Sequence, residues 1–229
     1  MASVQGPAPR YDGLADWYDD LTAAWADGNG VHLLDLLGPG TGLCLDLGCG
    51  TGQNLGTLRA TGRTVVGLDY SADQLRLAER RRAPGEPLIR GDAAALPFAD
   101  ATFPTVVTVW LSTDVDDFTS VVREAARVLR PGGTLVCYGA HPCFTGPHTE
   151  DLPDGGRVVH PTYRTPGWHS SAPWWREDGV RRRLGMRHTP LAELLNAFVS
   201  AGLVISRFLE PPGGPVPRVL ALRAEKPAA

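Results

Sequence analysis

The chain has 229 residues, with a hydrophobic fraction of 43% and a charged fraction of 21%, which is the composition of one ordinary globular domain. Its formal net charge of −3 disfavours nucleic-acid binding as the main activity, because phosphate backbones attract basic proteins. No apolar run approaches the ~20 residues of a membrane span, and the N-terminus has no apolar signal segment, so we expect a cytoplasmic protein.

The first half of the sequence predicts a repeating pattern of strands and helices. Helical spacing over residues 12–37 indicates two helices, which end at Gly38-Pro39-Gly40. A short apolar run over 43–47 predicts a strand, and a helix follows at about 53–60. The next strand, 64–68, ends at Asp69, and Ser71 with Gln74 forms a capping box that opens a helix over 72–82.

The second half continues the pattern and then interrupts it. Strands are predicted at 88–90, 105–110 and 133–138, with a helix at about 117–129. Periodicity fades over 140–187, which we interpret as an insertion that serves as a lid or binding loop. Thr189 then caps a helix that starts at Pro190 and runs to 201, before strands at 203–209 and 217–224. Alternating strands and helices indicate an α/β fold with a parallel, doubly wound sheet.

A glycine loop follows the first predicted strand, with the sequence DLGCGTG from Asp46 to Gly52. Its third glycine comes one position earlier than in the GxGxxG fingerprint, which argues against NAD. Glycines here let the chain turn sharply and let a ligand lie against bare backbone.

Two acidic residues follow the next strands. Asp69 stands where a doubly wound fold places a carboxylate that accepts hydrogen bonds from both ribose hydroxyls of an adenosine ligand. Asp92, with its neighbouring backbone, follows the third strand and suits the edge of an adenine ring. A solvated turn aspartate is the alternative for Asp92.

Four segments, LDLGCGTG, VVGLDYS, GDAAALPFAD and RVLRPGGTLV, together resemble class I S-adenosylmethionine (SAM)-dependent methyltransferases, in particular the small-molecule branch that includes ubiquinone and menaquinone biosynthesis enzymes. The resemblance implies a Rossmann-like, seven-stranded, mostly parallel sheet with an antiparallel last strand and helices on both faces. It implies SAM as the cofactor, S-adenosylhomocysteine as its product, no metal, and one domain over 1–229 with an N-terminal helical cap over 1–40.

The same resemblance implies cofactor contacts along the first half of the chain. The implied residues are Tyr18, Asp46, Gly48, Gly50, Thr51, Gly52, Asn54, Asp69, Tyr70, Gln74, Asp92, Ala93 and Leu111. Ser112 and Thr113 replace a histidine pair common in relatives, so no role carries over to them, and a helix-capping turn is an equal interpretation.

Methyl transfer is an in-line displacement, so positioning and exclusion of water supply most of the catalysis. A hydroxyl acceptor would gain from a histidine base. His141, directly after the fifth strand, and His188, before the C-terminal helix, are the candidates, with structural histidines as the alternative.

The insertion supplies candidates for acceptor binding. Trp168, Trp174 and Trp175 suit a flat aromatic pocket or simple core packing. Its arginines suit either an acidic acceptor or a solvated helix face: Arg176, Arg181, Arg182, Arg183 and Arg187. A zinc site at Cys137, His141, Cys143 and His148 lacks paired ligand spacing.

We therefore expect a monomer or homodimer that methylates a small molecule, most readily at oxygen, in specialised or quinone metabolism. Nitrogen and carbon acceptors use the same scaffold and are the alternatives to oxygen. The alternatives are a related fold that catalyses a rearrangement or cyclisation with SAM as a structural ligand, and a non-catalytic SAM-binding subunit of a partner protein.

Overall fold

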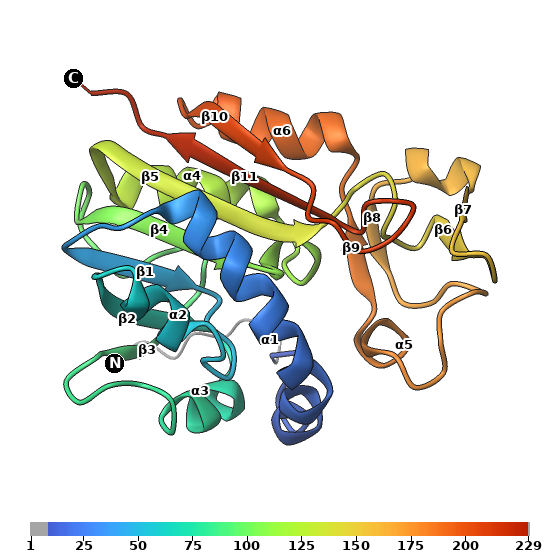
Figure 1. Ribbon diagram of the computed structural model, residues 1–229, viewed down its shortest axis with the longest axis horizontal. Helices are drawn as coiled ribbons and strands as arrows, with labels where there is room; N and C mark the ends of the chain where they lie inside the picture. The colour runs from blue at the N-terminus through green and yellow to red at the C-terminus, as the bar shows by residue number, and fades with distance from the viewer. Residues whose placement is uncertain (1–8, 229) are drawn as a thin grey trace.

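A seven-stranded sheet runs through the centre of the molecule with strand order β10-β11-β5-β4-β1-β2-β3 (Figure 1). The computed structural model describes residues 9–228, apart from the side chains at 24–27 and 29. Within this sheet β11 runs antiparallel to both of its neighbours, β10 and β5, and the other described strand pairs are parallel, so the predicted fold class is confirmed. The strands of this sheet are β1 Leu43–Leu47, β2 Thr64–Asp69, β3 Leu88–Arg90, β4 Phe103–Val109, β5 Leu129–Ala140, β10 Val204–Leu209 and β11 Val219–Glu225.

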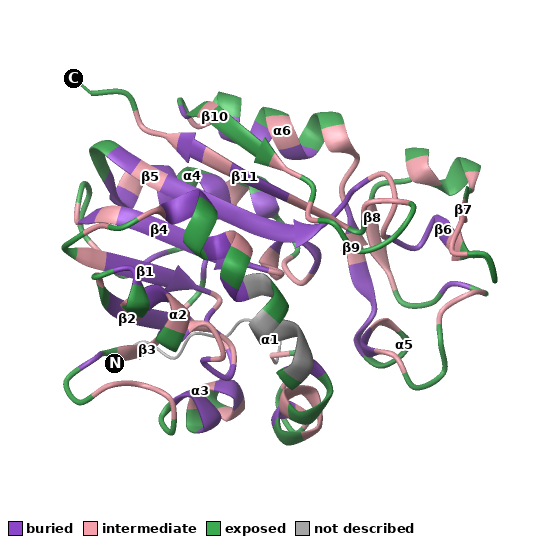
Figure 2. Cartoon of the chain, viewed as in Figure 1, coloured by how far each residue is buried: buried purple, intermediate pink, exposed green. Residues whose placement is uncertain are grey.

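Helices cover both faces of the sheet. On one face, α1 (Ala15–Leu37) and α2 (Leu55–Ala60) bury leucines against β1, β4 and β5. On the other, α4 (Phe118–Val128) and α6 (Leu191–Ser200) pack Phe118 and Phe198 into a second core cluster. The central strands are buried along most of their length (Figure 2), which explains their nearly continuous apolar sequences. A shorter helix, α3 (Ala72–Ala78), lies between β2 and β3 in the chain.

The N-terminal region forms one helix rather than the two that were predicted. Gly28 and Gly30 lie inside α1, although glycine costs about 1 kcal/mol relative to alanine in a helix interior. Leu33 and Leu36 on the following turns are fully buried against the sheet. Tertiary packing of this end therefore outweighs the local preference of the glycines.

Two predicted helix starts have different outcomes. The Ser71 hydroxyl accepts a hydrogen bond from the Gln74 backbone N–H at 3.1 Å, as predicted, but the Ser71 N–H donates to Asp69 and not to the Gln74 side chain. Helix α6 begins after Pro190, and no side chain caps it, so the predicted cap at Thr189 is wrong.

The segment 140–187 contains regular structure that its sequence does not announce. Two small antiparallel pairs form, β6 (Thr149–Asp151) with β7 (Arg157–Val159) and β8 (Gly167–His169) with β9 (Met186–His188). Each strand has three residues, too few to establish an alternating pattern. Two short helical segments also lie in the insertion, η2 (Pro161–Arg164) and α5 (Val180–Leu184), and a third, η1 (Leu111–Thr113), follows β4.

Candidate functional site

The glycine loop turns tightly at the carboxyl end of β1. Gly48, Gly50 and Gly52 all have positive φ angles, which L side chains rarely adopt. A Cβ on Gly48 would stand 2.8 Å from the Leu111 side chain, so the loop also needs glycine for space. The Gly48 and Cys49 N–H groups donate to the Leu68 carbonyl, which ties the loop to β2.

A cavity of about 390 Å³ opens beside this loop, at the carboxyl ends of the strands. This edge is where parallel α/β sheets hold their ligands. Nine of the residues predicted to contact the cofactor line it: Tyr18, Gly48, Gly50, Asp69, Tyr70, Gln74, Asp92, Ala93 and Leu111.

Asp69, the last residue of β2, lines this cavity. Its carboxylate accepts backbone hydrogen bonds from Gly50 at 2.8 Å and from Ser71 at 2.9 Å. Burial raises the pKa of Asp69, and these backbone donors oppose the shift. The Tyr70 backbone N–H is a third donor to this carboxylate. Because a carboxylate offers about four acceptor positions, Asp69 keeps acceptor capacity for a ligand hydroxyl group. Asp92 accepts from the Ala94 N–H at 2.8 Å, which fixes the turn after β3.

Four predicted cofactor residues do not line the cavity. The Thr51 hydroxyl donates to Asp19 at 2.6 Å and so ties the loop to α1. A Cβ on Gly52 would meet Leu55 and Ala78, so this glycine permits close packing of the loop on α2 and α3. The Asn54 side-chain oxygen is buried without a hydrogen-bond partner among the described residues.

Asp46, the fourth of these residues, is a buried carboxylate in β1. It is only 1% exposed, and neither of its oxygens has a hydrogen-bond partner among the described residues. Burial, reinforced by Asp69, raises its pKa to about 7.

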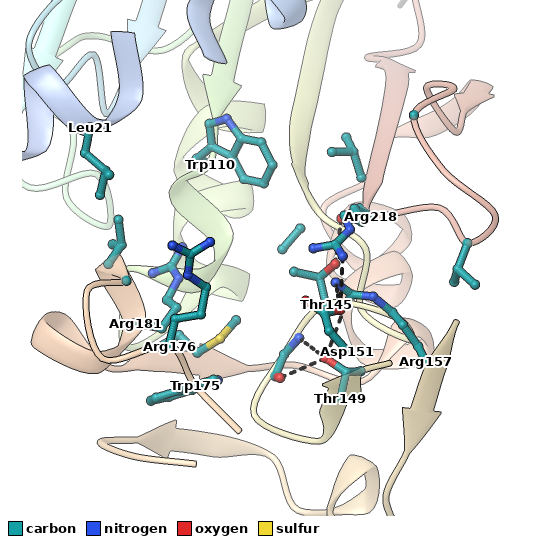
Figure 3. Close-up of a pocket in the computed structure, with 18 of the residues that line it drawn as sticks. Leu21, Trp110, Thr145, Thr149, Asp151, Arg157, Trp175, Arg176, Arg181 and Arg218 are labelled. Atoms are coloured by element: carbon teal, nitrogen blue, oxygen red, sulfur yellow. Dashed lines mark hydrogen bonds and ion pairs between the residues drawn. The ribbon is translucent and has the colours of Figure 1, made fainter. Parts of the chain in front are cut away.

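A second, larger cavity of about 760 Å³ lies between the end of the sheet and the insertion (Figure 3). Tyr138 and Ala140 of β5 line it from one side, and Trp174 and Trp175 line it from the insertion. Tyr18 and Trp110 belong to the linings of both cavities. The two spaces are therefore neighbours across these two aromatic side chains.

Trp110, which the sequence analysis did not single out, has an unusual backbone. It follows β4 with φ 62° and ψ 6°, a left-handed conformation that is costly for a bulky residue. Its backbone N–H donates to the Tyr138 carbonyl at 2.7 Å. Its ring packs edge to face on the Tyr138 ring, with 5.7 Å between the ring centroids. Such strain is concentrated at functional sites, and here it places an indole at the junction of the cavities.

A polar network joins three segments beside the junction. Arg181 of α5 pairs with Asp114 at 2.5 Å and donates to the Thr113 hydroxyl at 2.8 Å. Tyr11 hydrogen-bonds Asp114, and its ring contacts the Tyr18 ring edge to face at 4.9 Å. Burial, then Asp114, raises the pKa of Tyr18, which keeps its phenol protonated near neutral pH. Nothing in the sequence pattern links these distant residues.

The two histidines predicted as bases lie outside the linings of both cavities. His141 is buried, with Nε2 3.0 Å from Glu210 and Nδ1 accepting from the Cys143 N–H. His188 is also buried, and its Nε2 donates to the Tyr163 carbonyl at 2.7 Å. Burial lowers the pKa of His188. These contacts are those of histidines that hold the insertion together.

The three predicted tryptophans separate. Trp174 and Trp175 line the larger cavity, and Trp174 stacks on His160 at 4.0 Å between ring centroids. Trp168 lies outside the lining, with the Arg10 guanidinium 3.8 Å above its ring.

Most of the predicted arginines already have partners. Arg176 pairs with Asp178, Arg182 with Glu177, and the Arg183 guanidinium lies over the Trp17 ring at 4.2 Å. Arg157 and Arg218, which the sequence analysis did not select, also line the larger cavity. In the described part of the chain, no group of three or more His, Cys, Asp or Glu side chains is placed to hold a metal ion, and no helix is long and apolar enough to cross a membrane.

Comparison with known proteins agrees with the motifs. A family model described as a methyltransferase domain matches residues 45–137, the segment that contains all four motifs. The ubiquinone/menaquinone biosynthesis C-methyltransferase of Desulfotalea psychrophila is 43% identical over 150 residues, which cover 62% of this chain and 61% of that protein. The chain spans about half the length of the first curated relatives that it matches.

Solved structures share the fold. A putative SAM-dependent methyltransferase from Listeria monocytogenes has a TM-score of 0.71 at 19% identity, covering 88% of this chain and 99% of its own. The 4+2 cyclase SpnF has a TM-score of 0.64 at 18% identity, covering 89% and 82%. The predicted resemblance to class I SAM-dependent methyltransferases, in sequence motifs and in fold, is confirmed.

Proposed function

We propose that this protein transfers the methyl group of SAM to a small-molecule acceptor. The observation that carries the proposal is the pair of adjoining cavities. One is built from the glycine loop and Asp69, and the other lies beneath the insertion. Tyr18 and Trp110, which line both, mark where a methyl donor and an acceptor would meet.

The residues around the smaller cavity fit SAM. Asp69 keeps acceptor capacity for a ribose hydroxyl group, and the Gln74 side-chain amide is buried without a partner among the described residues. Asp46 lies directly under the loop as an unpaired carboxylate, which suits the positive charge of an amino acid ammonium group acting through the loop. Gly48 and Gly50 leave bare backbone on the cavity wall.

Bound SAM would supply an electrophilic methyl group on a sulfonium. The chain's own contribution is to orient the acceptor and exclude water, since the larger cavity is lined mainly by aromatic and apolar side chains. Tyr18, protonated because of its raised pKa, would donate a hydrogen bond at the junction and would not act as a base. The geometry gives no support to a base role for His141 or His188.

For the acceptor, we propose a small aromatic or polyketide-like molecule of specialised or quinone metabolism, methylated at oxygen. The aromatic lining from Trp110, Tyr138 and Trp175 supports the ring system. The Desulfotalea psychrophila relative is described as a ubiquinone/menaquinone biosynthesis C-methyltransferase, so carbon is the competing acceptor atom.

Calorimetric titration with SAM and with S-adenosylhomocysteine tests the cofactor site. The wild type should bind both, and Asp69→Ala should lose at least tenfold in affinity, because a carboxylate that accepts hydroxyl groups contributes about 1.5–3 kcal/mol. Asp35→Ala, on helix α1 and in neither cavity lining, is the control and should bind as the wild type does. Failure of the wild type to bind either compound would exclude the proposal.

Product analysis separates methyl transfer from the cyclisation alternative. Consumption of SAM with formation of S-adenosylhomocysteine in the presence of an acceptor supports transfer. Chemical change of the acceptor without consumption of SAM would instead favour a rearrangement or cyclisation on the same fold.

A further inference from the structure

Two arginines share a single carboxylate at the insertion end of the larger cavity. Arg157 Nη2 lies 2.6 Å from Asp151 Oδ1, and Arg218 Nη2 lies 3.0 Å from the same oxygen. Figure 3 shows this group with Thr145 and Thr149, across the cavity from Leu21 and Arg181. The three charged side chains come from the β6–β7 hairpin and from the residue directly before β11.

The side chain of Arg157 is buried, and its hydrogen-bonding capacity is not used up. Its side chain is 5% exposed, and its Nε has no partner among the described residues. Its other contacts go to the Phe144 carbonyl and, at 3.4 Å, to the Thr149 hydroxyl. Burial, then the nearby Arg218 guanidinium, lowers the pKa of Arg157. A guanidinium in this position lacks part of the negative charge that would balance it.

The arginines that line the larger cavity differ in whether each has a carboxylate of its own. Arg176, Arg181 and Arg182 each pair with a carboxylate of their own. Arg157 and Arg218 have only Asp151 between them, which leaves a local charge of +1 in a chain whose net charge is −3. A ligand that brings one negative charge would balance the group.

We propose that the acceptor carries a carboxylate, which binds between Arg157 and Arg218 while its apolar body lies against Trp110, Tyr138 and Trp175. Guanidinium groups bind carboxylates through paired N–H donors, and the bonds are stronger in a concave, partly apolar site. A phosphate dianion would bring two negative charges to a group whose local charge is +1, and so would be repelled by Asp151 more strongly than a carboxylate would. This inference rests on the proposed function in taking the larger cavity as the acceptor site.

Binding of three related probes tests the charge requirement. We expect 2-naphthoate to bind at least tenfold more tightly than 2-naphthamide in calorimetric titration, because a charge-assisted hydrogen bond contributes about 1.5–3 kcal/mol. We also expect 2-naphthoate to bind more tightly than 2-naphthyl phosphate. Equal binding of the acid and the amide, no binding of the acid, or tighter binding of the phosphate would each overturn the proposal.

Three variants assign the effect to these residues. Arg218→Gln, at a half-exposed position that tolerates change, should remove most of the preference for the acid over the amide. Asp151→Asn raises the local charge to +2 and should increase that preference. Arg176→Gln is the matched control, because Arg176 lines the same cavity but is 81% exposed and paired with Asp178. An unchanged preference in Arg218→Gln would contradict the assignment.

Titration with S-adenosylhomocysteine keeps this inference separate from the proposed function. If S-adenosylhomocysteine binds and the acid shows no preference, the carboxylate site is wrong and the cofactor site stands. If the acid binds as expected and S-adenosylhomocysteine does not, the anion site stands and methyl transfer fails.

Discussion

Asp46 is a buried carboxylate directly before the glycine loop, where it lowers the stability of the empty protein and suits a positively charged ligand. The sequence places it before the glycine loop, and the structure buries its carboxylate with no partner among the described residues. A buried, unpaired carboxylate is costly in its charged form, and it persists where a bound cation can compensate it. The position therefore carries a cost in stability that a ligand would relieve.

Replacing Asp46 with asparagine should stabilise the protein at alkaline pH. The folded pKa of Asp46, about 7, lies above its unfolded value, so stability is full at pH values below the unfolded pKa and is lost as pH rises to 7. At pH 8 the full cost applies, on the order of 4 kcal/mol as an upper limit. Urea denaturation should show Asp46→Asn to be more stable than the wild type at pH 8, with a much smaller difference at pH 5. The same difference at both pH values would contradict a titrating Asp46.

At the scale of elements, the insertion is held together by side chains that the sequence leaves unassigned. His148 is fully buried before β6, and its ring lies 4.3 Å from His188 of β9 and 5.2 Å from Tyr163. Its Nε2 contacts the Cys143 carbonyl at 3.2 Å, while Nδ1 has no partner among the described residues. The nearby His169 of β8 also opposes a positive charge on His148 and so lowers its pKa.

We expect this cluster to make the insertion sensitive to acid. Burial, then His188, lowers the pKa of His148 to about 4. Because this pKa lies below the unfolded value near 6.5, the contribution to stability is complete above pH 6.5 and is lost as pH falls towards 4. Hydrogen exchange of residues 149–188 should therefore accelerate from pH 6.5 to 4, after correction for intrinsic rates. His148→Gln should reduce this pH dependence, whereas His32→Gln, on α1, should retain it.

The sequence predicts those parts of the fold in which a physical requirement restricts the residue types at adjacent positions, as it does in a buried strand or a ligand-binding loop. Strand β1, the loop glycines and Asp69 follow from the need to bury a parallel strand and bring backbone to a ligand. The insertion was not predictable in detail, because three-residue strands carry no period. Arg157 and Arg218 meet only through tertiary folding, so no local pattern distinguishes them from solvated arginines.

Across the molecule, the ion pair and hydrogen bonds around Asp114 join the wall of the smaller cavity to the wall of the larger one. Asp114 lines the smaller cavity, Arg181 lines the larger one, and the pair joins the segment after β4 to helix α5. Tyr11 adds the N-terminal segment through its hydrogen bond to Asp114. The position of the insertion and the shape of the cofactor cavity are thus set by one set of contacts.

We therefore expect Arg181→Met to weaken binding of S-adenosylhomocysteine several-fold, although Arg181 does not line the smaller cavity. Removing one partner of a largely buried ion pair leaves the other charge uncompensated, which costs about 3–5 kcal/mol and would displace Asp114 from its present position. Arg176→Met, in the same segment and exposed, is the control and should bind as the wild type does. Calorimetric titration of both variants, with circular dichroism to confirm folding, measures the effect. Wild-type affinity in a folded Arg181→Met would mean that the insertion and the cofactor cavity are independent of each other.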